Sequence, residues 1–149
     1  MESLSFESMT MIKESLLNIR KSISLLMEWN RDLQNVEEWL NSSTGMQKLA
    51  ANCMLIEAIG EAVKKIEHRA GEEFLSLRPE IPWSEVMSMR NHIAHGYFEI
   101  DEDYVFSVIK NDLLPLMEAI DALIKHVETM MIEKEVDDHC TDPVPSRST

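Results

Sequence analysis

Apolar side chains recur every three or four positions along most of this chain, which is the spacing of amphipathic helices rather than of β-strands. The most regular run predicts a first helix from about Phe6 to Met27. Its core-facing stripe would comprise Met9, Ile12, Leu16, Ile19, Ile23 and Leu26. The stretch 30–40 is less regular, and it predicts a short helix around Trp39.

A second long helix is predicted after the polar segment 41–45. Thr44 and Gln47 have the spacing of a capping box, which places the start of this helix at Thr44. Its apolar positions extend to Ile66. Gly60 interrupts them at a cost to helix stability of about 1 kcal/mol relative to alanine, so we expect another helix to approach the backbone closely there.

Two further helices are predicted in the second half of the chain. Pro82 is placed to start a helix from about Trp83 to His95, which Gly96 would end. Asp101 would cap a last long helix that Pro115 should kink. Its core-facing positions would be Val105, Ile109, Leu113, Leu116, Ile120, Leu123, Val127 and Met130.

These segments together predict an all-α fold in a single domain of residues 1–135. Glycine and proline are scarce, at 4 and 5 residues, which agrees with a helical chain. The remaining segment, 136–149, has no apolar period and predicts a flexible acidic C-terminal tail.

Cysteine content and the length of the apolar runs indicate where the protein resides. Cys53 and Cys140, the only two cysteines, define no disulfide framework, which favours a reducing compartment. The N-terminal segment has no basic stretch leading into an apolar run, and no run approaches the roughly 18 apolar residues of a membrane span. We therefore expect a cytoplasmic protein with neither a signal peptide nor a membrane segment.

The formal net charge of −13 excludes a nonspecific nucleic-acid binder, because phosphate contacts rely on a basic surface. Any contact with RNA must come from a local concentration of cationic side chains. Lys64, Lys65, His68 and Arg69 form one compact basic group. The alternative interpretation of that group is an ordinary solvated helix face.

Arg90 occupies a position where the helical pattern predicts an apolar residue. The stripe on the predicted helix 83–95 would read Trp83, Val86, Arg90, Ile93 and Tyr97. A guanidinium is costly to bury unless it is paired, so Arg90 needs an ion-pair partner, a ligand or a subunit interface. A structural ion pair with a glutamate at the edge of the core is the alternative to a functional role.

His95 follows Arg90 by five residues, roughly 140° around an ideal helix, so the two side chains of one copy would not point at the same spot. Two copies facing each other across a two-fold axis could bring both pairs into one cleft. Histidine can accept the proton of a ribose hydroxyl near neutral pH, and arginine can stabilise the charge that grows on a phosphoryl group. The pair therefore fits cleavage of RNA without a metal.

Two histidines near Arg90 have a spacing that is compatible with a metal site. His92 and His95 are three residues apart and could share a metal ion, but no third ligand is evident in the sequence. We assign no metal.

The run Arg90, Asn91, three further residues, His95, Gly96 and Tyr97 resembles the signature of the HEPN superfamily, in which an arginine with a polar neighbour precedes a histidine by a few residues. The longer run IPWSEVMSMRNHIAHGYFEID, with IGEAVKKI upstream and DLLPLMEAI downstream, is similar to HepT-like proteins. These are the ribonuclease toxins of MNT/HepT toxin-antitoxin pairs. The similarity covers residues 44–123.

This resemblance implies a HEPN-like, up-and-down bundle of four to five helices. It implies that Arg90 and His95 are the catalytic pair of a metal-independent endoribonuclease without a cofactor, and that Asn91 is a supporting polar residue. It also implies a homodimer with a shared cleft, RNA as substrate, and a MNT-like nucleotidyltransferase antitoxin as partner. Tyr97 matches the tyrosine that this partner silences by AMPylation, and the alternative is a packing aromatic at the end of the stripe.

Two other functions are compatible with the same residues. A non-catalytic HEPN module could use Arg90 and His95 to bind a nucleotide or to dock a nucleotidyltransferase. A purely structural helical adaptor could use Arg90 as an interface ion pair, which the acidic surface favours.

Overall fold

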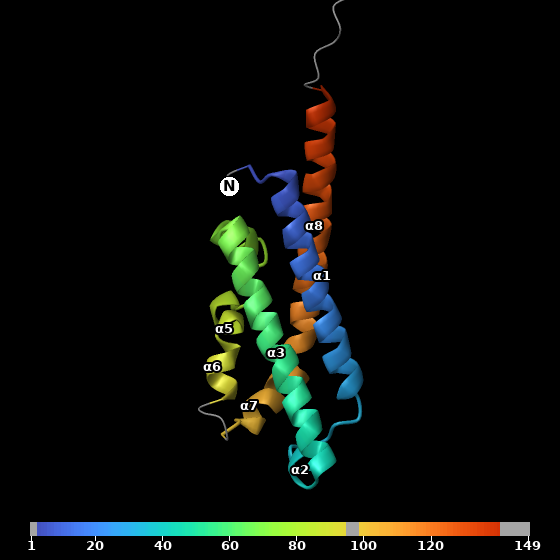
Figure 1. Ribbon diagram of the computed structural model, residues 1–149, viewed down its shortest axis with the longest axis vertical. Coiled ribbons are helices and arrows are strands. Elements are labelled where there is room, and N and C mark those ends of the chain that lie inside the picture. Colours follow the sequence, from blue (N-terminus) through green and yellow to red (C-terminus); the bar gives the residue numbers. More distant parts are fainter. Residues whose placement is uncertain (1–2, 95–98, 141–149) are drawn as a thin grey trace, which may run out of the picture.

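The computed structural model describes residues 3–94 and 99–140, and within these ranges the backbone forms helices and no β-strand (Figure 1). The all-α prediction is confirmed. The helices are α1 (Phe6–Trp29), α2 (Glu37–Leu40), α3 (Ser43–Ala70), α4 (Glu72–Leu75), α5 (Trp83–Met87), α6 (Met89–Ile93), α7 (Glu102–Ser107), the π-helix η1 (Val108–Asp112) and α8 (Leu113–Cys140). No helix in these ranges is long and apolar enough to cross a membrane.

The helices form an up-and-down bundle. Figure 1 shows α1, α3, the α5–α6 segment and α8 running along the long axis of the molecule, each in the direction opposite to the one before. α1 packs against both α3 and α8, while α5 and α6 lie along α3. Three long helices therefore enclose most of the core, and the short helices attach to α3.

The first helix has the predicted start and the predicted buried face. Ser5 caps it, because its hydroxyl oxygen accepts the backbone N–H of Ser8 at 3.1 Å. The six residues of the predicted stripe are all buried. The exposed Arg20 guanidinium of α1 also pairs with Asp121 of α8 at 2.6 Å.

The start of α3 differs from the prediction. Ser42, with an extended backbone, is the N-cap, and its hydroxyl accepts the backbone N–H of Gly45 at 2.9 Å. The helix therefore begins at Ser43, and the capping box predicted at Thr44 is wrong. Gly45 lies so close to α2 that an added Cβ would stand 2.4 Å from the carbonyl oxygen of Glu38. This packing of α2 explains the glycine in the first turn.

Asn30 and Asn52 are the only buried polar residues in the described core, and they bond to each other. The Asn30 amide donates to the Asn52 Oδ1 atom at 2.9 Å, and the Asn52 amide donates back at 3.1 Å. Asn30 also donates to the carbonyl oxygen of Leu26 at 2.7 Å. Because an unpaired buried amide is costly, these two reciprocal hydrogen bonds fix the end of α1 against α3.

The last predicted helix is divided into α7, η1 and α8. The Asp101 carboxylate accepts the backbone N–H of Tyr104 at 3.1 Å, which confirms the predicted cap. The wider π turn η1 lies just before Pro115, whose ring nitrogen cannot bond to a carbonyl of the preceding turn. Figure 1 shows α7 inclined to α8, so the predicted interruption takes the form of this π turn.

The core-facing residues predicted from Val105 to Val127 are buried, and Met130 is partly buried. α8 continues to Cys140, so residues 136–140 are helical where the sequence predicted the start of the tail. A packed helix can extend past its last buried turn because each added residue gains one backbone hydrogen bond. Residues 141–149 lie outside the described part of the chain.

Gly60 provides the close approach that the sequence predicted. A Cβ atom added there would stand 2.9 Å from the carbonyl oxygen of Val86, which belongs to α5. The contact is with backbone, so a side chain at this position could be accommodated only by moving the α5–α6 segment.

Replacing Gly60 with alanine is expected to lower the free energy of unfolding by about 1 to 3 kcal/mol, because overpacking outweighs the gain in helix propensity. Urea denaturation followed by circular dichroism measures this change. The matched control is Lys65→Gly on the exposed surface of the same helix, which tests helix propensity and should cost about 0.5 to 1 kcal/mol. A Gly60→Ala variant more stable than the parent would contradict the close approach.

Candidate functional site

The helix predicted over residues 83–95 is broken at Ser88. α5 ends at Met87 and α6 begins at Met89, and Ser88 between them has φ −103° and ψ 11°. The Ser88 hydroxyl donates to the carbonyl oxygen of Ser84 at 3.0 Å. Because such side-chain bonds compete with the backbone ladder, serine favours a break of this kind. The prediction of one continuous helix is therefore wrong.

Arg90 is exposed and does not lie on the buried face. The buried residues of α5 and α6 are Trp83, Val86, Met89 and Ile93. Met89 takes the place that the sequence assigned to Arg90, because a thioether costs far less to bury than a guanidinium. The predicted position of Arg90 on the core stripe is therefore wrong, and the guanidinium faces solvent.

A groove of about 430 Å³ lies between α3 and α6, and Arg90 and Asn91 line it. We call it the Arg90 groove. Its other lining residues are Cys53, Glu57, Ile93, Ala94 and Ile100. Within residues 3–94 and 99–140, the Arg90 guanidinium has no ion pair or side-chain hydrogen bond. It is therefore available to an anionic ligand.

The chain leaves α6 through a short pinned segment. Ala94 has an extended backbone and pairs with Ile100 in an isolated antiparallel bridge. The backbone N–H of Asp101 donates to the carbonyl oxygen of Ile93 at 2.7 Å. Since the helix ends at Ile93, the 140° helical-wheel separation predicted for Arg90 and His95 does not apply. His95, Gly96 and Tyr97 lie outside the described residues.

His92, which the sequence offered as one of two candidate metal ligands, contacts an aromatic ring. Its ring stacks on that of Tyr104 in α7, with centroids 5.2 Å apart and an interplanar angle of 28°. In the described part of the chain, no group of three or more histidine, cysteine, aspartate or glutamate residues could hold a metal ion. His92 thus joins α6 to α7.

The family model for ribonuclease HepT-like proteins matches residues 12–123, which include every element around the Arg90 groove. The chain belongs to the ribonuclease HepT-like family. The match begins inside α1 and ends inside α8, so it spans the bundle described above. No solved structure matches the chain significantly.

Two relatives illustrate the HepT-like similarity. The chain is 31% identical over 113 residues to the "Probable ribonuclease HepT" of Thermococcus cleftensis, covering 76% of this chain and 96% of the relative. It is 30% identical over 102 residues to a protein of Methanocaldococcus jannaschii that is named as a candidate RNase, covering 68% of this chain and 86% of the relative. The similarity therefore extends over nearly the whole length of the Thermococcus cleftensis relative.

Sequence reasoning missed two residues that line the Arg90 groove of this HepT-like chain, Cys53 and Glu57. They are one turn apart on the side of α3 that α6 covers, and both line the Arg90 groove. Burial raises the pKa of the Cys53 thiol to about 11, and the nearby Glu57 carboxylate contributes to the same shift. Gly60 could have indicated this face of α3, because it lies one turn further along the same side.

The predicted basic group of the HepT-like chain lies along α3 at its C-terminal end. Lys64, Lys65, His68 and Arg69 are exposed and line a surface depression between α1 and α3. Lys64 pairs with Glu61 at 3.1 Å. Since Glu14 and Glu61 line the same depression, the surface is of mixed charge, as on an ordinary solvated helix face.

The raised pKa predicts that Cys53 reacts slowly with iodoacetamide at neutral pH. A shift of the pKa from 9.0 to about 11 lowers the thiolate fraction at pH 7 by about 100-fold. In a Cys140→Ser background, the alkylation rate measured by mass spectrometry should keep rising up to pH 10 or above. Cys53→Ser in the same background identifies any other labelled site. A rate that levels off near pH 9 would disprove the shift.

Proposed function

We propose that this chain is a metal-independent endoribonuclease and the toxin of a type II toxin-antitoxin pair. Membership of the ribonuclease HepT-like family supports the reaction class. The observation that carries the proposal at the residue level is the exposed Arg90 guanidinium in the Arg90 groove, which has no ion-pair partner in the described residues. The alternative of a structural ion pair with a glutamate finds no such pair among the described residues.

Arg90 and His95 divide the chemistry between them. The His95 imidazole takes the proton of a ribose 2′-hydroxyl, and the bond from this oxygen to phosphorus forms as the bond to the 5′-oxygen breaks. The leaving 5′-oxygen takes up a proton. The planar Arg90 guanidinium stabilises the charge that develops on the phosphoryl oxygens. Asn91, beside Arg90 in the groove, supplies a further polar contact.

Chain connectivity supports a role for His95 beside Arg90. His95 is bonded directly to Ala94, which lines the Arg90 groove. The end of α6 at Ile93 removes the helical constraint that would have kept the two side chains apart.

The enzyme acts as a homodimer. The exposed face of α3 beside the groove carries Ala50, Met54 and Ala58, and the Met54 side chain is 64% exposed. A second copy would cover these apolar groups and bring two grooves together around a two-fold axis. The composite cleft would then hold both Arg90 side chains, which offsets the acidic charge of the rest of the surface.

Tyr97 is the site at which the antitoxin silences the enzyme. A MNT-like nucleotidyltransferase transfers AMP from ATP to the Tyr97 hydroxyl, and pyrophosphate leaves. The added bulk and negative charge would block the cleft and repel the RNA backbone. Tyr97 stands two residues after His95 in the sequence, which supports a role at the same cleft.

Substituting Arg90 or His95 with alanine should lower RNA cleavage by about 100-fold or more, because each removes a group that acts in the transition state. Cleavage of total cellular RNA in excess EDTA, and growth inhibition on expression, measure the loss. Arg90→Lys keeps the charge without the planar donor fork and should recover only part of the activity.

Arg31→Ala is the matched control for Arg90, because it removes an exposed arginine from the loop after α1. It should leave both activities unchanged. If an Arg90→Ala, His95→Ala double variant remained as active and as toxic as the parent, the proposed catalytic pair would be incorrect. Binding of ATP without RNA cleavage by the parent would instead favour the non-catalytic nucleotide-binding module.

Tyr97→Phe should leave the ribonuclease activity intact and prevent its silencing. After incubation with ATP and a MNT-like nucleotidyltransferase, the parent should carry AMP on Tyr97 by mass spectrometry and lose activity, whereas Tyr97→Phe should stay active. The matched control is Tyr104→Phe, since Tyr104 is the other of the two tyrosines. AMP addition to the Tyr97→Phe variant with loss of activity would refute the assignment.

A further inference from the structure

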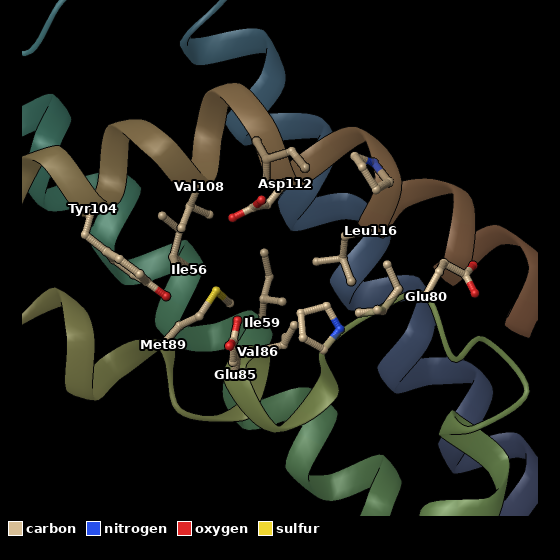
Figure 2. A pocket seen from close by; sticks show the side chains of 14 residues that line it. Ile56, Ile59, Glu80, Glu85, Val86, Met89, Tyr104, Val108, Asp112 and Leu116 are labelled. Carbon is tan, nitrogen blue, oxygen red and sulfur yellow. The ribbon is translucent and has the colours of Figure 1, made fainter.

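A second hollow in the molecule shares no lining residue with the Arg90 groove. It has a volume of about 260 Å³ and lies between α3, α5 and the segment formed by α7, η1 and the start of α8 (Figure 2). Its floor is apolar and buried. The floor residues are Ile59, Val86, Met89, Val108 and Leu116.

Three oxygen-bearing side chains converge over this floor. Figure 2 shows the carboxylates of Glu85 and Asp112 and the hydroxyl of Tyr104 directed into the hollow from α5, η1 and α7. Glu85 and Asp112 are exposed, whereas the floor is buried, so the acidic groups surround the mouth. The hollow thus has a negative rim above an apolar base.

The two carboxylates at the mouth lack a compensating cation in the described part of the chain, where neither forms an ion pair. Burial, and then the charge of Glu85, raise the pKa of Asp112. The pKa of Tyr104 is raised by burial and then by Asp112, Glu85 and Asp101. Burial is the larger cause of both shifts, and the smaller, electrostatic cause comes from carboxylates alone, whose negative charge a bound cation would offset.

Glu80 also lines the hollow, but its negative charge is neutralised by an ion pair. Its carboxylate pairs with the Arg78 guanidinium at 2.6 Å. Figure 2 shows the Glu80 carboxylate directed away from the other two acids. Glu80 is therefore a natural internal control for Glu85 and Asp112.

We infer that this hollow binds a free protonated aliphatic amine, with its alkyl chain on the apolar floor and its ammonium group between Glu85 and Asp112 at the mouth. The hollow is smaller than the sites that enclose drug-sized molecules, which start at roughly 300 Å³, so a short amine fits. The negative rim matches the ammonium group of such a molecule, and the apolar floor matches its alkyl chain.

Because the charged groups lie at the mouth and the apolar surface lies inside, the hollow fits a free amine better than a lysine side chain of a partner protein or a divalent cation. A lysine side chain of a partner protein would enter with its ammonium first, which would place the charge on Val86 and Met89 and the alkyl stem beside the carboxylates. A divalent cation needs about six oxygen ligands, and an apolar floor supplies none. A free amine can enter with its alkyl end first.

The test is a titration of the full chain with n-butylamine and n-hexylamine, followed by NMR of the methionine methyl groups. The Met89 methyl on the floor should shift in a saturable manner, while that of Met54 on the exposed face of α3 should not. Each added methylene should tighten binding by about fourfold. Hexan-1-ol and heptanoate, with the same hexyl chain and no positive charge, should bind at least about fivefold more weakly.

Glu85→Gln and Asp112→Asn should each weaken binding of n-hexylamine at least about fivefold, whereas Glu80→Gln should leave it unchanged. Both acids are exposed, so these variants keep the packed floor. Equal binding of hexan-1-ol and n-hexylamine would overturn the inference, as would equal losses in all three variants. The absence of a saturable Met89 shift, or a shift with magnesium chloride in place of the amine, would also overturn it.

Discussion

The approach of the Val86 carbonyl oxygen to Gly60 is the contact on which the functional half of the molecule depends. It lets α5 rest on the backbone of α3 with no side chain between them. The chain then breaks at Ser88 and continues as α6 along the same face of α3. A side chain at position 60 would push this segment outward and open the groove in which Arg90 lies. The glycine therefore acts on the site without touching it.

Regular apolar spacing was enough to predict an all-α fold, whereas the up-and-down bundle came from the family resemblance. The spacing failed where two neighbouring residues fit it equally well. The buried stripe of α1 and the Asp101 cap follow directly from local patterns. From Val86 to Ile93, steps of three and four lead through Met89 as well as they lead through Arg90. Spacing cannot choose between them, and the cost of burying a guanidinium decides in favour of Met89. The Ser88 break was missed because serine is also tolerated within helices.

The candidate site was predicted from its motif more fully than from its geometry. The resemblance named Arg90 and Asn91, and both line one groove. Cys53 and Glu57 were missed because they are remote in sequence and join the groove only through the packing of α6 on α3. Because the Arg90 guanidinium is exposed to solvent, its charge carries no desolvation cost in the fold. Stability and function are thus largely separate at this position, whereas Met89 touches both the core and the second hollow.

The pair of buried amides formed by Asn30 and Asn52 has a consequence for how the chain finds its structure. Apolar stripes repeat at every turn, so α1 could slide along α3 by one turn, about 5.4 Å, and still cover much of the same surface. Two amides can meet face to face at a single offset. Any slipped arrangement would bury both without partners. The asparagines thus act as an alignment mark that converts a graded hydrophobic fit into a choice between one correct register and many excluded ones.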